Sequence, residues 1–91
     1  KGIESGIHSW WYKNGNLKSK GLFSNDVPNG LWVYWYETGQ KSGEGILKKG
    51  KQDGLVTEWH KNGKVAEERI YKNGQFLSKI EWDAEGSIKK K

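Results

Sequence analysis

The sequence predicts an all-β fold, a single-layer antiparallel meander of tandem β-hairpins with a period of about 24 residues. Glycines recur at this spacing in Gly6, Gly30 and Gly54. A tryptophan precedes each expected hairpin tip, at Trp11, Trp35, Trp59 and Trp82. Each tip holds a glycine between runs rich in branched and aromatic residues, at Gly15, Gly39, Gly63 and Gly86. So many positions agreeing at one offset indicate a repeat array rather than a composition bias.

The third unit shows the expected hairpin most clearly. The run 55–60 has the length and the branched and aromatic content of a strand, and the run 65–72 is the returning strand. Between them, Asn62 and Gly63 form a hairpin tip, because both residues tolerate the positive φ that such turns need. Asn73 and Gly74 are expected to turn the chain again.

One repeat array is expected over residues 1–91. We expect the end of a preceding repeat, complete repeats and a partial last repeat over 1–5, 6–29, 30–53, 54–76 and 77–91. Residues 1–6 resemble residues 49–54, the link between two hairpins, so we interpret the chain as a piece of a longer array. In the first exit turn, expected at 25–29, Asp26 stands where other units have glycine. Pro28 is expected in that turn because proline cannot donate to a strand ladder.

The composition fits a repeat array better than a closed core. The 91 residues are 33% hydrophobic and 30% charged, and many of the apolar side chains are aromatic. Each unit of an array covers its neighbour, so no central core is needed. The absence of cysteine excludes disulfides and thiolate metal sites and does not indicate a compartment. No segment has the length of a membrane span.

Alternation along the outgoing strands separates two faces of the expected sheet. The first, which we call the uniform face, recurs in every unit and is assigned a structural role; it carries Ile7, Ser9, Trp11, Leu31, Val33, Trp35, Leu55, Thr57, Trp59, Ser78, Ile80 and Trp82. The second, which we call the variable face, changes from aromatic to charged along the chain; it carries His8, Trp10, Tyr12, Trp32, Tyr34, Tyr36, Val56, Glu58, His60, Lys79, Glu81 and Asp83. A face that changes is not needed to hold every repeat together.

The sequence allows two hairpin registers. A two-residue tip places Leu31 opposite Ile46 and Leu55 opposite Ile70. A three-residue tip with a bulge instead places Trp11 opposite Leu17 and Val33 opposite Gly43. We favour the second register, because glycine often ends a type I turn.

These residues carry a family resemblance. The stretch Gly30-Leu31-Trp32-Val33-Tyr34-Trp35-Tyr36-Glu37-Thr38-Gly39 resembles the MORN repeat variant found in bacterial YwqK-family antitoxins, and the similarity covers essentially the whole chain. The third unit matches at Gly54, Trp59, Gly63 and Gly74, and it departs from the pattern at His60 and Arg69. The resemblance implies stacked β-hairpins in a single-layer sheet and a non-enzymatic role in binding or scaffolding. It implies no particular binding residues.

The sequence offers little for catalysis. His8 and His60 occupy different positions within their repeats, and no Ser-His-acid spacing, metal-ligand cluster or phosphate-binding loop is present. Turns account for the glycines. We therefore expect no enzyme activity, no cofactor, no metal site and no small-molecule substrate.

The net charge of +5 invites the idea of an acidic partner. Three of these charges come from Lys89, Lys90 and Lys91, so the other 88 residues carry 13 basic and 11 acidic side chains. Mixed signs do not favour nucleic acid, which clustered cations bind. Lys48, Lys49 and Lys51 form the compact internal cluster, and a membrane surface or acidic lipid is the alternative partner. A charged turn that keeps a flat sheet soluble would look the same.

The variable face supplies the candidate site. Its aromatic residues should form one exposed patch across the first two hairpins, comprising Trp10, Tyr12, Trp32, Tyr34 and Tyr36. Contiguous exposed aromatic residues mark partner surfaces, although cross-strand ring packing or cover from further repeats would also explain them. We expect this patch to bind a protein partner or a second copy of the chain. Open sheet edges offer another route to self-association, one that cutting a longer array would itself create.

Overall fold

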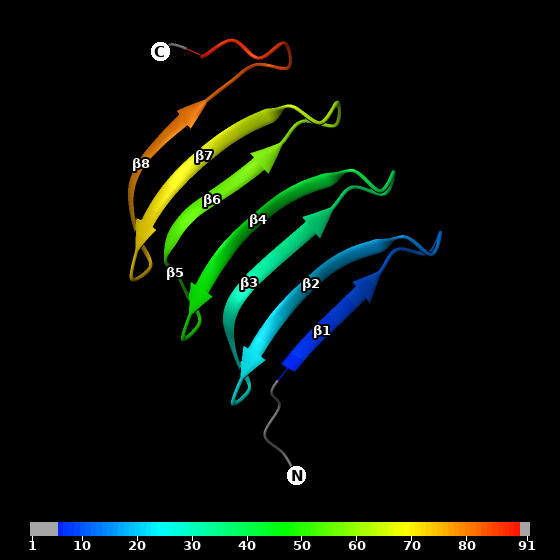
Figure 1. Ribbon diagram of the computed structural model, residues 1–91, viewed down its shortest axis with the longest axis vertical. Coiled ribbons are helices and arrows are strands. Elements are labelled where there is room, and N and C mark those ends of the chain that lie inside the picture. Colours follow the sequence, from blue (N-terminus) through cyan, green and yellow to red (C-terminus); the bar gives the residue numbers. More distant parts are fainter. Residues whose placement is uncertain (1–5, 90–91) are drawn as a thin grey trace.

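The computed structural model describes residues 6–89 and forms one open antiparallel sheet (Figure 1). Its strands are β1 (Gly6–Trp11), β2 (Leu17–Ser24), β3 (Val27–Trp35), β4 (Lys41–Lys48), β5 (Lys51–Gln52), β6 (Gly54–Trp59), β7 (Val65–Lys72) and β8 (Gln75–Glu81). They lie side by side in chain order, except that the short β5 pairs only with β4. The molecule measures 50 × 35 × 12 Å. All eight strands belong to this one sheet, and the described residues form no helix or second sheet that packs on it, so the fold is a single layer. The predicted fold class is confirmed.

The hairpin tips are three-residue loops closed by a glycine. In the first, the Tyr12 N–H donates to the Asn16 carbonyl over 2.8 Å and the Gly15 N–H donates to the Tyr12 carbonyl over 3.0 Å. Gly15 has a φ of 94°, which a residue with a side chain rarely adopts. The same pair of bonds closes the tips at 36–40, 60–64 and 83–87. This is the type I turn with a glycine bulge that the sequence predicts.

The register inside each hairpin combines features of both predicted alternatives. Trp11 lies opposite Leu17, as the three-residue tip requires. The prediction that Val33 faces Gly43 is wrong, because Val33 pairs with Glu44. A second bulge next to the tip, at residue 18, 42 or 66 of the return strand, shifts the pairing by one residue. As a result, Leu31 pairs with Ile46 and Leu55 with Ile70.

The exit turns between hairpins hold only two residues. Asn25 and Asp26 have φ values of 53° and 69°, and Lys49–Gly50 and Asn73–Gly74 have the same positive φ at both positions. This is the type I′ geometry whose twist matches paired strands. The predicted longer first turn is therefore wrong: β3 begins at Val27 and includes Pro28. Proline is tolerated there because the ladder between β2 and β3 is irregular at this point.

Hydrogen bonds also join consecutive repeats at the exit turns. The Asn29 side chain accepts a bond from the Lys49 N–H over 2.8 Å, and the Asp53 carboxylate accepts one from the Asn73 N–H over 3.0 Å. These acceptors lie 24 residues apart. Each repeat therefore fixes the turn of the next one.

No closed core forms in the part of the chain that the structure describes. Among residues 6–89, the buried non-glycine side chains are Val33, Val56 and Thr57, with 7–8% of their surface exposed. All three lie in the middle strands of the sheet. Both faces of the sheet therefore present side chains to solvent.

The described residues contain no helical segment that is long and apolar enough to span a bilayer.

Candidate functional site

Five aromatic rings meet on the variable face over β1, β2 and β3. Trp10 stacks on Trp32 with ring centres 5.7 Å apart, Phe23 meets Trp32 edge-on at 5.3 Å, and Tyr34 lies 6.4 Å from Trp32. His8 packs edge-on against Phe23 at 4.7 Å. Trp32 is thus the centre of what we call the aromatic cluster, comprising His8, Trp10, Phe23, Trp32 and Tyr34.

The strand register explains why these rings meet. Gly21 lies between His8 and Trp32 in neighbouring strands, so no side chain separates them. A Cβ at Gly21 would lie within 2.1–2.5 Å of the Trp32 ring, which shows that the indole rests directly on the backbone. The Trp32 indole N–H also donates to the Leu22 carbonyl over 3.1 Å. Trp32 is therefore fixed in place.

The outer rings of the aromatic cluster face solvent. Trp10 is 40% exposed and Tyr34 is 44% exposed, whereas Trp32 is half-buried beneath them. The cluster therefore has a rigid centre and an accessible rim. Rigid, amphipathic rings of this kind are the side chains that contribute most to binding energy in protein interfaces.

The other two predicted site residues, Tyr12 and Tyr36, link neighbouring repeats. Both are half-buried. The Tyr12 hydroxyl donates to the Trp35 carbonyl, and the Tyr36 hydroxyl to the Trp59 carbonyl, each over 2.6 Å. His60 occupies the same position in the third repeat, with Nε2 2.9 Å from the Trp82 carbonyl oxygen. The structure thus divides the five predicted residues: three lie in the aromatic cluster and two join hairpins.

Sequence reasoning did not place His8 and Phe23 in the site. Phe23 lies on a return strand, and only the register shows that its side chain shares a face with the outgoing strand. Tyr12 and Tyr36 carried a signal, because an aromatic residue or histidine recurs after the Trp of each complete repeat. Such a recurrence marks a contact that every repeat needs.

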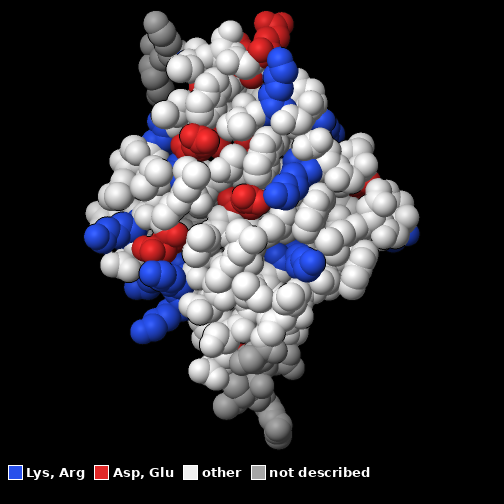
Figure 2. All heavy atoms as spheres, in the orientation of Figure 1, with Lys and Arg blue, Asp and Glu red and all other residues white. Residues whose placement is uncertain are grey.

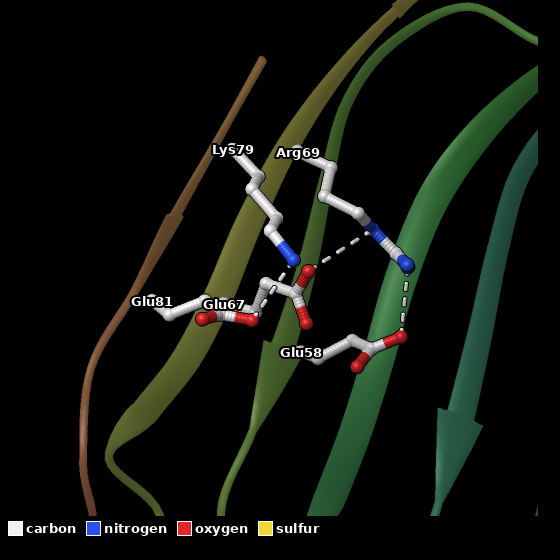
Figure 3. Close-up of polar contacts among 5 residues, drawn as sticks. All are labelled: Glu58, Glu67, Arg69, Lys79 and Glu81. Atoms are coloured by element: carbon white, nitrogen blue, oxygen red, sulfur yellow. Dashed lines mark hydrogen bonds and ion pairs between the residues drawn. The ribbon is translucent and has the colours of Figure 1, made fainter. Parts of the chain in front are cut away.

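The same face carries charged residues over β6, β7 and β8 (Figure 3). Arg69 donates to Glu58 over 2.8 Å, and its Nε lies 3.9 Å from a Glu67 oxygen. Lys79 pairs with Glu81 over 3.1 Å. We call this group the ionic network. Its carboxylates lie opposite one another in three neighbouring strands, so the two cations between them offset the mutual repulsion.

The uniform face carries an exposed row of apolar side chains. Ile7 and Leu22 pair across β1 and β2, and two further pairs follow along the sheet. The aliphatic residues that are 39–61% exposed in this row are Ile7, Leu31, Ile46, Leu55 and Ile70. This face was assigned a structural role from the sequence, and in the structure it is open to solvent.

The titratable groups do not assemble into a reactive constellation within residues 6–89. No group of three or more His, Asp or Glu side chains there is placed to hold a metal ion. The backbone N–H of Asn73 holds the pKa of Asp53 below its ordinary value of 3.8, with help from Lys48. The backbone N–H groups of Ser87 and Glu85 similarly lower the pKa of Asp83. Both carboxylates fix turns, which accounts for their shifts.

Comparison with family models identifies the repeat. The MORN repeat variant model matches residues 4–25, 28–49 and 52–73, which is well over half of the chain. The chain belongs to the MORN repeat variant family. Comparisons with curated proteins and with solved structures give no match.

The three matched segments of this MORN array start 24 residues apart, in agreement with the period of the glycines and tryptophans. MORN repeats are commonly modules that interact with proteins or membranes. The aromatic cluster, the ionic network and the apolar row are the side-chain groups described above on the two faces of this array.

Proposed function

We propose that this MORN array is a non-enzymatic module that binds or scaffolds proteins, and that the aromatic cluster is its binding surface. One observation carries the proposal. The position of Trp10 in its repeat is filled by Tyr34, Glu58 and Glu81 in the following strands. The fold accepts a carboxylate at this position, so the exposed rings at Trp10 and Tyr34 are not required to hold the sheet together.

Exposed rings that the fold does not need are the expected feature of a partner site. Such rings bury a large apolar area on binding and lose little side-chain entropy. Trp32 and Gly21 hold the neighbouring rings in position beforehand, which lowers the entropic cost of association. The occupant is a protein partner or a second copy of the chain.

The test replaces the exposed rim and leaves Trp32 intact. Trp10→Gln with Tyr34→Gln should abolish the capture of a specific partner in quantitative affinity purification, or remove self-association in sedimentation velocity. The matched control is Phe76→Gln with Leu77→Gln, two exposed apolar residues of β8 outside the aromatic cluster. Retained binding by the first variant, with the fold intact by circular dichroism, would refute the proposal.

The resemblance to bacterial YwqK-family antitoxins suggests a narrower form of this proposal, in which the partner is a toxin protein. Co-purification of the chain with the product of a neighbouring gene, and rescue of growth when the two are co-expressed, would support it. The Trp10→Gln, Tyr34→Gln variant should lose both effects if the aromatic cluster is the contact. Rescue without physical association would argue against a direct antitoxin.

The second candidate function is association with an acidic membrane surface. Lys48, Lys49, Lys51 and Lys72 are exposed at the exit turns, and their sign suits anionic lipid. Flotation with vesicles containing phosphatidylserine tests this directly. Binding that disappears when Lys48, Lys49 and Lys51 are replaced by Gln would favour this function over protein binding.

A further inference from the structure

The apolar row on the uniform face runs straight across the array. Ile7 pairs with Leu22, Leu31 with Ile46, and Leu55 with Ile70. Between hairpins, Leu22 reaches the backbone of Gly30, next to Leu31. Ile46 lies two residues after Glu44 and Leu55 two residues before Thr57, so the antiparallel ladder pair of Glu44 and Thr57 places both on the same side of that pair and on the same face. The row therefore crosses six strands without a polar interruption.

The two sides of the apolar row differ in charge. Toward the tips it is bordered by a mixed row that includes Lys20, Glu44 and Glu68. Toward the exit turns it is bordered by exposed lysines, namely Lys48, Lys49, Lys51 and Lys72. Figure 2 shows several basic side chains at the left edge, where Figure 1 places the exit turns, and others over the middle and right of the view. Two acidic residues also lie at this edge, Asp26 in the first exit turn and Asp53, which is 3.7 Å from Lys48.

The spacing of the row suits an α-helix lying across the strands. Neighbouring strands are about 4.8 Å apart, and one helical turn rises about 5.4 Å, so each turn meets roughly one strand. A partner segment in the extended conformation would fit less well. Side chains on one of its faces recur about every 6.7 Å, so they would lose register with the strands of the sheet within three strands. Five strand gaps span about 24 Å, which about 16 helical residues cover.

We propose that the apolar row binds an amphipathic α-helix of a partner protein, with acidic residues along the flank that faces the exit-turn lysines. The site lies on the face opposite the aromatic cluster. It rests on the proposed function only in that both treat the array as a protein-binding module. The helix would lie at right angles to the strands, with Leu31, Ile46 and Leu55 at its centre.

A lipid surface fits the same row less well. Glu44 and Glu68 lie beside the apolar side chains on this face, and anionic headgroups would repel them. A helix avoids this conflict, because it carries different charges on its two flanks. The narrow row also matches the narrow apolar stripe of a helix better than the broad plane of a bilayer.

The experiment uses a display library of 18-residue helix-biased peptides. Each carries leucines at i, i+4, i+7 and i+11, while the flanking positions vary between Glu, Lys and Gln. We expect the intact chain to enrich peptides with Glu along one flank. The enriched peptide should bind at least tenfold more tightly than its Glu→Lys counterpart in isothermal titration calorimetry.

Substitutions in the chain locate the site. Leu31→Gln with Leu55→Gln should weaken the enriched peptide at least tenfold, whereas Trp10→Gln with Tyr34→Gln should leave it unchanged. If the first pair impairs folding, Lys48→Glu with Lys72→Glu should move the preference from Glu to Lys peptides. These two side chains are exposed at the ends of β4 and β7, so their replacement should leave the fold intact.

Several outcomes would overturn the proposal. These are no enrichment, equal enrichment of Lys and Glu flanks, or binding that depends on Trp10 and Tyr34. Binding to phosphatidylserine vesicles that requires Leu31 and Leu55, without peptide binding, would assign the row to lipid instead. The aromatic cluster on the other face would keep its proposed role in each of these cases, and peptide binding that depends on Trp10 and Tyr34 would support that role.

Discussion

The aromatic cluster and the ionic network occupy equivalent places on one face of the sheet, at opposite ends of the array. In the first repeat Gly21 lies opposite Trp32, and in the third Arg69 lies opposite Lys79. The strands that carry them follow the same hairpin geometry. One backbone therefore supports two kinds of surface.

The difference shows what the repeat requires. Tips, exit turns and the apolar row recur in the complete hairpins, whereas the variable face is filled by rings at one end and by ion pairs at the other. The second repeat lies between the two, with Gly45 next to Val56. The fold tolerates an aromatic ring, a valine or a charged side chain at such a position, so the residue there can be selected for binding. The stability of the two ends should also respond differently to an added methyl group and to salt.

The largest effect on the free energy of unfolding is expected at Gly21, on which the Trp32 ring of the aromatic cluster rests. Gly21→Ala would place a methyl group inside the Trp32 ring, and the resulting displacement should lower the free energy of unfolding by about 2–3 kcal/mol. The matched control is Gly43→Ala, whose Cβ would lie at an ordinary 3.5 Å from the Thr57 carbonyl oxygen. Urea denaturation of both variants checks this, and equal losses would refute the role of Gly21.

The next effect concerns the link between the two ends. Tyr36→Phe removes the hydrogen bond to the Trp59 carbonyl and should cost about 1 kcal/mol of unfolding free energy. Tyr34→Phe removes a hydroxyl from an exposed ring of the aromatic cluster, so its effect should be a few tenths of a kcal/mol at most. If both variants unfold at the same urea concentration, the tyrosine link contributes nothing.

Salt should separate the ionic network from the aromatic cluster. Arg69→Gln leaves Glu58 and Glu67 without their cation and should cost about 0.5–1 kcal/mol at low ionic strength. The cost should shrink in about 1 M NaCl, where the Debye length falls to about 3 Å. The cost of Gly21→Ala should not change with salt. If the loss of unfolding free energy in Arg69→Gln does not change with salt, the guanidinium stabilises the fold by packing rather than by its charge.

The smallest effect at neutral pH is expected at an exit turn. Folding lowers the pKa of Asp53 below 3.8, so its contribution to stability is complete above that value and is lost as the pH falls through the lower folded-state pKa. Asp53→Asn keeps an acceptor for the Asn73 N–H, as Asn29 does one repeat earlier. Thermal unfolding should differ little at pH 7, and the variant should lose less stability than the wild type below about pH 4. Identical acid profiles would contradict this.

The fold was predictable because its signals are local and repeated. Gly15, Gly39 and Gly63 mark tips that need a positive φ, and this requirement holds whatever surrounds the hairpin. The register was not predictable in full. The second bulge, at residue 18, 42 or 66, has no residue type that marks it, so the prediction for Val33 failed.

The candidate site was predictable only in part, for a related reason. Trp10, Trp32 and Tyr34 were identified from alternation along single strands. Phe23 joins them through pairing between strands, which alternation does not report. The hydroxyl groups of Tyr12 and Tyr36 bond to carbonyls 23 residues away, and only the stacking of hairpins brings these groups together.

The sequence by itself determined the repeat, the turns and the alternation of two faces, because each depends on backbone conformations and spacings within a few residues. The tertiary structure alone decided which side chains from different strands share a row and which rings remain exposed. Those features depend on register, and a bulge of one residue changes the partner of every side chain beyond it. In a single-layer sheet the register therefore sets the binding surfaces, while the local sequence sets the fold.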